Sequence, residues 1–264
     1  MSSYERYIGI DYSGASAPTQ SLPGLRAFLA TGDGLPVEEP PPPSPRKYWT
    51  RRGLAEWLNL TLSDSTPTIV GIDHAFSFPR KYFERYDIEK SWDAFLDDFC
   101  AHWPTDEDHV CVDFVRDGLN GNGAAREGDT RWRRLTEERA PGAKSVFHFD
   151  VPGSVAKSTH AGIPWLRYLR RLYGDSIHFW PFDGWIVPAG VHTLVEVYPS
   201  LWSGLYPAKG RTEHQQDAYT VCRRLSELDR NSTLTKYLTP DLSSDERNTA
   251  AYEGWIFGVG VEEQ

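Results

Sequence analysis

The chain has 264 residues, of which 39% are apolar and 25% are charged, so it has the composition of a globular protein that can bury a sizeable core. The formal net charge of −9 argues against a protein that coats nucleic acid nonspecifically, although it leaves room for local basic grooves. The three cysteines are too few and too scattered for a disulfide framework or a zinc site. We therefore predict a single domain over residues 1–264.

The N-terminal sequence lacks an apolar stretch of the length that a signal peptide or a membrane span requires. Together with the cysteine usage, this leads us to expect a cytoplasmic protein without a membrane partner. The ten tryptophans, thirteen tyrosines and twelve phenylalanines exceed what a small core usually holds. We expect them either to line a cleft or interface in part, or to form an aromatic core.

The first part of the chain alternates predicted strands and helices. Residues 7–11 and 25–30 are short apolar runs typical of buried strands. The proline run at 40–45 predicts an extended surface loop, or less simply a site for a proline-reading partner. Thr50 is suited to cap a helix with apolar residues at helical spacing, and the next strand is predicted over 68–73. Because a strand, a helix and a strand form a parallel pair, we expect the first and last of these strands to end at one sheet edge.

The rest of the chain is less regular before it returns to the same pattern. Residues 79–190 are predicted to be a large insertion, with helices over 91–103 and 164–173 separated by glycine-rich and basic loops. We then predict one more buried strand followed by two helices, over residues 194–199, 212–228 and 246–259.

Four carboxylates stand out by their position in these elements. Asp11 and Asp73 each end a predicted parallel strand within a Gly-Ile-Asp sequence, Glu196 lies on a later strand, and Asp217 lies on the helix after it. Open α/β sheets bind ligands at the carboxyl edge of their strands. The simpler alternatives are that the two aspartates cap turns, that Glu196 is a hydrogen-bonded core acid, and that Asp217 faces solvent.

Carboxylates gathered at one edge repel one another, and a divalent cation relieves this repulsion. Magnesium or manganese suits a set of oxygen ligands, and such ions can activate water for phosphodiester hydrolysis. The sequence therefore predicts a magnesium or manganese site.

Several short motifs resemble the domain of unknown function 429, a family of predicted RNase H-like nucleases. The resemblance covers most of the chain and rests on the order of the motifs at residues 8–14, 70–73, 196–199, 214–218 and 250–256. It implies an RNase H-like α/β fold, with a mixed five-stranded sheet flanked by helices and the insertion between the fourth and fifth strands.

The resemblance also implies which residues form the site. Asp11 and Asp73 match the acids of the first and fourth strands, which lie side by side in this fold, and Asp217 matches the late helical acid that completes the metal site. Glu196 matches a family motif whose chemical role is not settled. The long insertion and the proline run depart from the family pattern and leave the substrate open.

Other polar residues are candidates for supporting roles. His214, three residues before Asp217, can assist proton transfer, although a lone histidine is more often structural, and His74 is a weaker candidate. Ser13 can donate to a phosphate or only close the turn after the first strand.

The insertion offers two basic segments. Arg131 and its neighbours Arg126, Arg133 and Arg134 are interleaved with Trp132, a pattern that suits phosphate and base contacts, although nearby acids favour a solvated helix face. Lys144 begins a polar loop that can close over a ligand.

Three functions remain open from the sequence. The first is a metal-dependent nuclease or phosphodiesterase that acts on nucleic acid or on a small phosphoester. The second is an ATP-binding phosphotransferase of the actin and sugar-kinase kind, because residues 11–14 after a strand resemble its first phosphate loop, although no second such turn follows Asp73. The third is a noncatalytic binding protein that keeps the fold.

Overall fold

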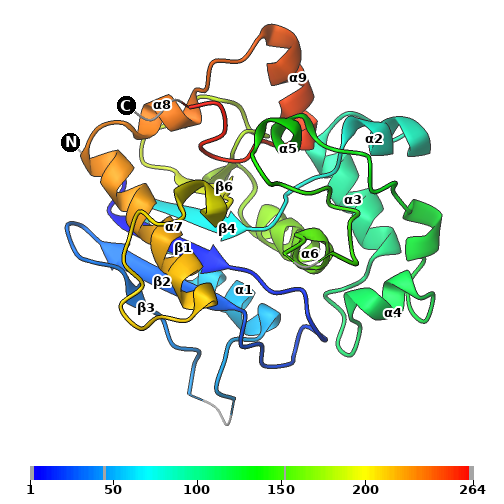
Figure 1. Ribbon diagram of the computed structural model, residues 1–264, viewed down its shortest axis with the longest axis horizontal. Helices are drawn as coiled ribbons and strands as arrows, with labels where there is room; N and C mark the ends of the chain where they lie inside the picture. The colour runs from blue at the N-terminus through cyan, green and yellow to red at the C-terminus, as the bar shows by residue number, and fades with distance from the viewer. Residues whose placement is uncertain (1–2, 44–45, 152, 262–264) are drawn as a thin grey trace.

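One mixed sheet organises the computed structural model, which describes residues 3–43, 46–151 and 153–261. The order of its strands is β3-β2-β1-β4-β6-β5 (Figure 1). Strands β1, β4, β6 and β5 run parallel to one another. At the other edge, β2 pairs antiparallel with β1, and β3 pairs antiparallel with β2. The strands are β1 (Arg6–Asp11), β2 (Arg26–Thr31), β3 (Val37–Glu38), β4 (Thr68–Asp73), β5 (Ile177–Phe179) and β6 (His192–Glu196).

The prediction of an α/β fold with a mixed sheet flanked by helices is confirmed, but the sheet has six strands instead of five. The two strands that the sequence did not reveal, β3 and β5, have only two and three residues. Such short strands are below the length at which an alternating pattern can be recognised. β5 also lies within residues 79–190, so the end of the predicted insertion contributes an edge strand to the sheet.

Nine α-helices are assigned within the described ranges, together with three short 3-10 turns. The helices are α1 (Arg51–Thr61), α2 (Arg80–Tyr86), α3 (Trp92–His102), α4 (Val112–Arg116), α5 (Leu135–Arg139), α6 (Ala156–Tyr173), α7 (Glu213–Arg230), α8 (Leu234–Leu238) and α9 (Ser244–Glu253). The 3-10 turns are η1 (Gly123–Arg126), η2 (Gly174–Ser176) and η3 (Pro199–Trp202). The side chains of Thr50, Ser91, Thr212 and Ser243 cap α1, α3, α7 and α9 by accepting from backbone N–H groups of the first turn.

Two predicted helix boundaries were wrong. α6 begins at Ala156 and contains Pro164, which the sequence suggested as its start. Proline favours the first turn of a helix, but here the preceding residues are buried and tertiary packing holds them in the helix. α9 ends at Glu253 instead of continuing to residue 259, because Gly254 adopts a positive φ of 81° and terminates the helix.

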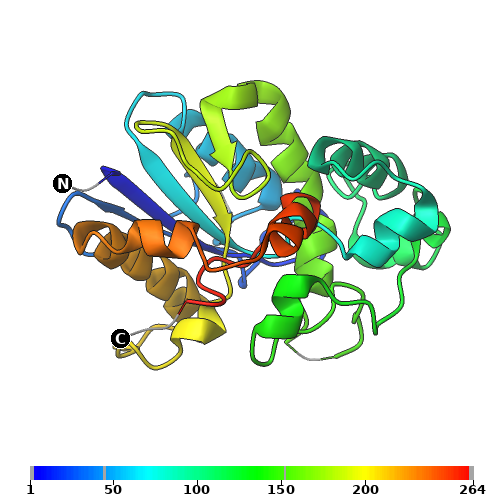
Figure 2. The same cartoon turned by 90° about the horizontal axis from the view of Figure 1, so that it is seen from above.

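Helices cover both faces of the sheet (Figures 1 and 2). Side chains alternate along β1 and β4, so that Ile10 and Ile72 join one hydrophobic cluster with α1 and α6, whereas Tyr7 and Ile69 join another with α7. Figure 2 shows the helices α2 to α5 gathered in a lobe beside the sheet.

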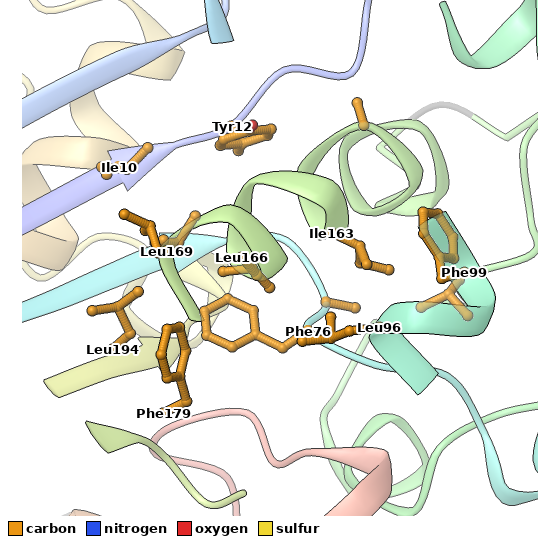
Figure 3. Packing of buried hydrophobic residues seen from close by; sticks show 14 of the residues in the cluster. Ile10, Tyr12, Phe76, Leu96, Phe99, Ile163, Leu166, Leu169, Phe179 and Leu194 are labelled. Carbon is orange, nitrogen blue, oxygen red and sulfur yellow. The ribbon is translucent and has the colours of Figure 1, made fainter. Parts of the chain in front are cut away.

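Helix α6 connects this lobe to the sheet. In Figure 3, Leu166 and Leu169 lie between the sheet residues Ile10 and Leu194, while Ile163 lies on the side of Phe99 of α3. All of them are buried in one hydrophobic cluster. The lobe and the sheet therefore share a core.

Most of the aromatic residues lie in the two hydrophobic clusters and not on an open surface. Phe78, for example, packs against Tyr82, Phe95, Phe99 and Phe147, with ring centroids 4.7 to 5.5 Å away. This arrangement favours the alternative of an aromatic core. The prolines of the run at residues 40–43 lie outside helices and strands, as expected for a surface loop, while Ser44 and Pro45 lie outside the described residues.

No helix within the described ranges is both long and apolar enough to cross a lipid bilayer.

Two glycines allow α7 to lie close to the sheet. Gly9 of β1 and Gly71 of β4 are register partners. A Cβ atom on Gly9 would lie 2.3 Å from the backbone oxygen of Ala218, and one on Gly71 would lie 2.6 Å from Cγ1 of Val221. The glycine of each Gly-Ile-Asp sequence therefore serves helix packing.

We expect Gly9→Ala to destabilise the protein by about 1–3 kcal/mol, because the added methyl group meets the backbone of α7, which cannot move aside without breaking its packing. Urea unfolding would measure the change. Gly34→Ala is the control: Gly34 lies in an exposed turn, where the nearest atom to a Cβ is 3.1 Å away and the chain can shift. Equal stability of the Gly9→Ala variant and the wild type would contradict the close packing.

Candidate active site

Asp11 and Asp73 lie side by side at the carboxyl ends of β1 and β4. The two strands pair in parallel, and the register places Asp11 opposite Asp73. Both aspartates come two residues after the glycines that face α7, so alternation directs them to the α7 side of the sheet. The sequence-based expectation that these two strand ends meet at one edge is confirmed.

Helix α7 places two more polar residues above this pair. Asp217 precedes Val221, and His214 precedes Ala218, by one helical turn, and Val221 and Ala218 are the residues that meet Gly71 and Gly9. The first two turns of α7 therefore extend over the strand ends on the same face. The Nδ1–H of His214 donates a hydrogen bond to Oδ2 of Asp11 over 2.7 Å.

The acids are held at an electrostatic cost. Burial and then repulsion from Asp11, Asp217 and Glu196 raise the pKa of Asp73 well above its usual value. Burial also raises the pKa of Asp11, although its hydrogen bond with His214 acts in the opposite direction. Burial and repulsion from Asp11 raise the pKa of Asp217 to about 6. The group thus carries more negative charge than its surroundings neutralise.

The chemistry of this donor set fits a hard divalent cation, which prefers carboxylate oxygens and would relieve the repulsion. Asp11 is 6% exposed, while Asp73 and Asp217 keep partial contact with solvent, so an ion from solution can reach them. In the described ranges, no three His, Cys, Asp or Glu side chains are already arranged as metal ligands. The side chains would therefore have to adjust around an ion.

Glu196 is in a different environment from the three aspartates. Its register partner on β4 is Ile72 and not Asp73, which directs its side chain away from the α7 face. Both carboxylate oxygens are bound to the guanidinium of Arg134, over 2.6 and 2.7 Å, and one also accepts from the backbone N–H of Phe76. Among the alternatives open from the sequence, this geometry matches a hydrogen-bonded core acid.

Arg134 was named from the sequence as one of several basic residues, but its buried pairing with Glu196 and Glu137 was not predicted. It lies at the start of α5, its side chain is 1% exposed, and it joins Glu196 of β6 to Glu137 of α5. It also donates to the backbone oxygen of Glu253 at the end of α9. The interpretation of the arginines at residues 126–134 as a solvated helix face is wrong for Arg134; Glu137 three residues later was the available signal of an ion pair.

Of the other residues predicted to support the site, Lys144 and Ser13 lie near the acids and Arg131 does not. Lys144 lines a small cavity together with Asp73 and Glu196. Ser13 is half-buried, and a Cβ added to Gly24 would lie 3.5 Å from Cβ of Ser13 and 3.3 Å from ring atoms of His214, so Ser13 lies near the acids. Arg131 is 86% exposed and paired with Asp129, and it does not line this cavity.

His74 is sequestered under the site. Its Nδ1–H donates to the backbone oxygen of Ala75, and its ring contacts those of Tyr12 and Phe76. Complete burial lowers its pKa to about 4, so it is neutral at physiological pH. A structural role therefore fits His74 better than proton transfer.

The larger cavities lie away from the carboxylates. One, of about 290 Å³, is bordered by α2, α5 and α9, and another, of about 450 Å³, lies between the loop around Ile186 and α8. Neither contains any of the three aspartates. We place the candidate chemistry at the acids because charge and hydrogen bonding converge there, whereas cavity size alone shows no reactive group.

We expect Arg134→Ala to destabilise the protein by about 3–5 kcal/mol, because it leaves the buried carboxylates of Glu196 and Glu137 without a counterion. Guanidinium unfolding would measure the change. Arg131→Ala is the matched control from the same segment, and its stability should stay within about 0.5 kcal/mol of the wild type. Equal effects of the two substitutions would show that the buried ion pair does not hold the fold together.

Comparison of the chain with protein-family models, with curated proteins and with solved structures found no match. The resemblance to the domain of unknown function 429 therefore stays a prediction based on the order of its motifs.

Proposed function

We propose that the protein is a metal-dependent phosphodiesterase or nuclease on an RNase H-like fold. One observation carries the proposal: Asp11 and Asp73 are in register on adjacent parallel strands, with Asp217 of α7 on the same side. Their mutual repulsion supports a role in which positive charge is recruited to this edge.

Asp11, Asp73 and Asp217 would hold the ion, magnesium or manganese. Such an ion supplies positive charge to a phosphoryl group and lowers the pKa of water. The protein fixes the position of Asp11, because β1 pairs with β2 on one side and with β4 on the other, and His214 of α7 forms a hydrogen bond with the Asp11 side chain.

His214 is suited to move a proton at Nε2. Its Nδ1–H is engaged by Asp11, which fixes the ring orientation, and the side chain is 54% exposed. The hydrogen bond to Asp11 is the main cause of the raised pKa of His214, so the ring holds a proton more readily than a free histidine. A protonated ring beside the acids can give a proton to a leaving oxygen.

Among the alternatives, the phosphotransferase is less well supported. Proteins of that kind normally duplicate the core, and the residues that the structure describes form one sheet. A noncatalytic binding protein is compatible with the same fold and is separated from the proposal by the experiments that follow.

We expect manganese-dependent cleavage of at least one substrate among labelled single-stranded and duplex DNA and RNA and a small phosphodiester. Asp11→Asn and Asp73→Asn should each lower the rate by about 100-fold or more, because each removes a carboxylate that holds the ion. Asp33→Asn is the control, since Asp33 is 96% exposed on the turn after β2. Circular dichroism and thermal unfolding should show that all variants are folded.

A wild type that cleaves none of these substrates, and that is not stabilised by magnesium or manganese, would rule out the proposal. Metal-induced stabilisation measures binding to the folded state by mass action and does not depend on turnover.

Because the pKa of Asp217 is raised, we expect replacement of its carboxylate to increase the stability of the folded state in a pH-dependent way. The pKa of the Asp217 carboxyl is 3.8 in the unfolded chain and about 6 in the folded protein. Below pH 3.8 the carboxyl is protonated in both states, and above about pH 6 it is ionised in both. The folded state therefore loses stability as the pH rises from 3.8 to about 6. Without divalent ions at pH 7, Asp217→Asn should therefore be more stable than the wild type by about 1 kcal/mol, roughly 2–4 °C in melting temperature.

The advantage of Asp217→Asn should vanish below about pH 4 and shrink when magnesium is added. Asp64→Asn is a control for which we expect the opposite change in stability. The hydrogen bond between Asp64 and Arg6 lowers the pKa of Asp64 to about 2, so the ionised carboxylate stabilises the fold and its loss should lower the melting temperature at pH 7. Melting curves from pH 3 to 8 would test both. A lower stability of Asp217→Asn at pH 7 would contradict the repulsion.

A further inference from the structure

A buried residue of the insertion anchors the chain where it leaves β4. Thr159 lies in the first turn of α6 and is fully buried. Its Oγ1 accepts a hydrogen bond over 3.1 Å from the backbone N–H of Ala75, two residues after Asp73. Because a buried N–H without an acceptor is costly, this contact holds the chain after Asp73 against α6.

The residue between Asp73 and Ala75 also packs on α6. A Cβ on Gly162 would lie 2.4 Å from Nε2 of His74, so the ring of His74 lies directly against the helix. Helix α6 and helix α7 cover opposite faces of the sheet. The end of β4 is therefore held by α7 on one face and by α6 on the other.

The loop that follows Asp11 meets the same turn of α6. A Cβ on Gly14 would lie 2.0 Å from the backbone oxygen of Lys157, so the two backbones are in close contact. The buried guanidinium of Arg51 holds this loop by donating to the backbone oxygens of residues 13, 15 and 16. The first turn of α6 thus contacts the chain just after both aspartates of the strand ends.

These contacts bear on the acids because the pairing of the two strands ends with them. Asp11 and Asp73 are the last register partners of β1 and β4. Beyond this pair, the contacts with α6 determine how the two backbones lie, and movement there would let the carboxylates shift apart. A tightly held strand end therefore keeps the two acids at a fixed separation.

Fixed ligands favour one kind of cation. Magnesium requires a nearly octahedral arrangement of oxygens at short distances, whereas calcium accepts more ligands in a variable geometry. Selectivity between such ions depends on the size and flexibility of the site. Contacts that restrict the backbone beside Asp73 therefore favour the smaller ion.

We propose that Thr159 is a positioning residue that holds Asp73 in place for a small divalent cation, and that its hydrogen bond with Ala75 favours magnesium or manganese over calcium. The inference rests on the proposed function and makes α6 of the insertion a part of the cation site. Since Thr159 is fully buried, it acts through the backbone of residues 73–75 and not by contact with the ion.

Titration calorimetry with the metal chloride alone measures this effect without substrate. Thr159→Val is similar in size and lacks the hydroxyl, and we expect it to bind manganese about 10-fold or more weakly, as is typical for loss of a contact that supports a metal ligand. Thr159→Ser keeps the acceptor and should bind manganese as the wild type does. The affinity for calcium should fall by a smaller factor in Thr159→Val.

Thr105→Val is the matched control. Thr105 is also fully buried, and its hydroxyl donates to the backbone oxygen of His160, the neighbour of Thr159 on α6. This substitution removes a buried hydrogen bond to the same part of α6 but none with the end of β4, so manganese affinity should be unchanged. Melting curves without metal would verify that each variant is folded, and Thr159→Ala would serve if Thr159→Val is not.

The two levels of the proposal fail in different ways. If the wild type binds manganese and Asp73→Asn weakens this binding, equal affinity of Thr159→Val and the wild type would overturn the role of Thr159 and leave the proposed function in place. An equal loss in Thr105→Val would also overturn it, because general loosening of α6 would then explain the effect.

The response to calcium tests the selectivity separately. Equal factors of loss for manganese and calcium in Thr159→Val would overturn the claim that its hydrogen bond favours the smaller ion. No binding of manganese or magnesium by the wild type would instead refute the metal-dependent function itself.

Discussion

The close packing of α7 on β1 and β4 is the constraint on which the candidate site depends. Gly9 and Gly71 are register partners, and neither position has space for a Cβ atom against the helix. The side chains two residues later point to the same side of the sheet, so this packing also determines that Asp11 and Asp73 face the first two turns of α7. Stability and charge placement therefore arise from the same contact.

This packing concentrates negative charge, and the fold compensates for it only in part. His214 forms a hydrogen bond with Asp11, yet the pKa values of Asp11, Asp73 and Asp217 all stay raised. On the other side of the sheet the compensation is more complete, because Arg134 binds Glu196 and Glu137. The contrast between a neutralised pair and an uncompensated group distinguishes an acid that stabilises the fold from acids suited to chemistry.

The insertion contributes to both regions. Arg134 belongs to it and anchors it to β6 and α9, while the loop that carries Lys144 borders the pocket beside Asp73. Helix α6 continues the shared core from this lobe to the sheet. The loops of residues 79–190 therefore both stabilise the core and border the acid edge of the sheet.

The sequence by itself determined the main strands, helices α1, α3 and α7, and the pairing of Asp11 with Asp73, because apolar alternation, capping residues and repeated motifs are local signals. Only the tertiary structure decided the roles of Glu196 and Arg134. Both depend on strand register and on contacts between residues 62 positions apart, and a sequence pattern does not encode which buried charges will meet. The two short strands β3 and β5 form for the same reason, since pairing with a neighbour and not local preference holds them in place.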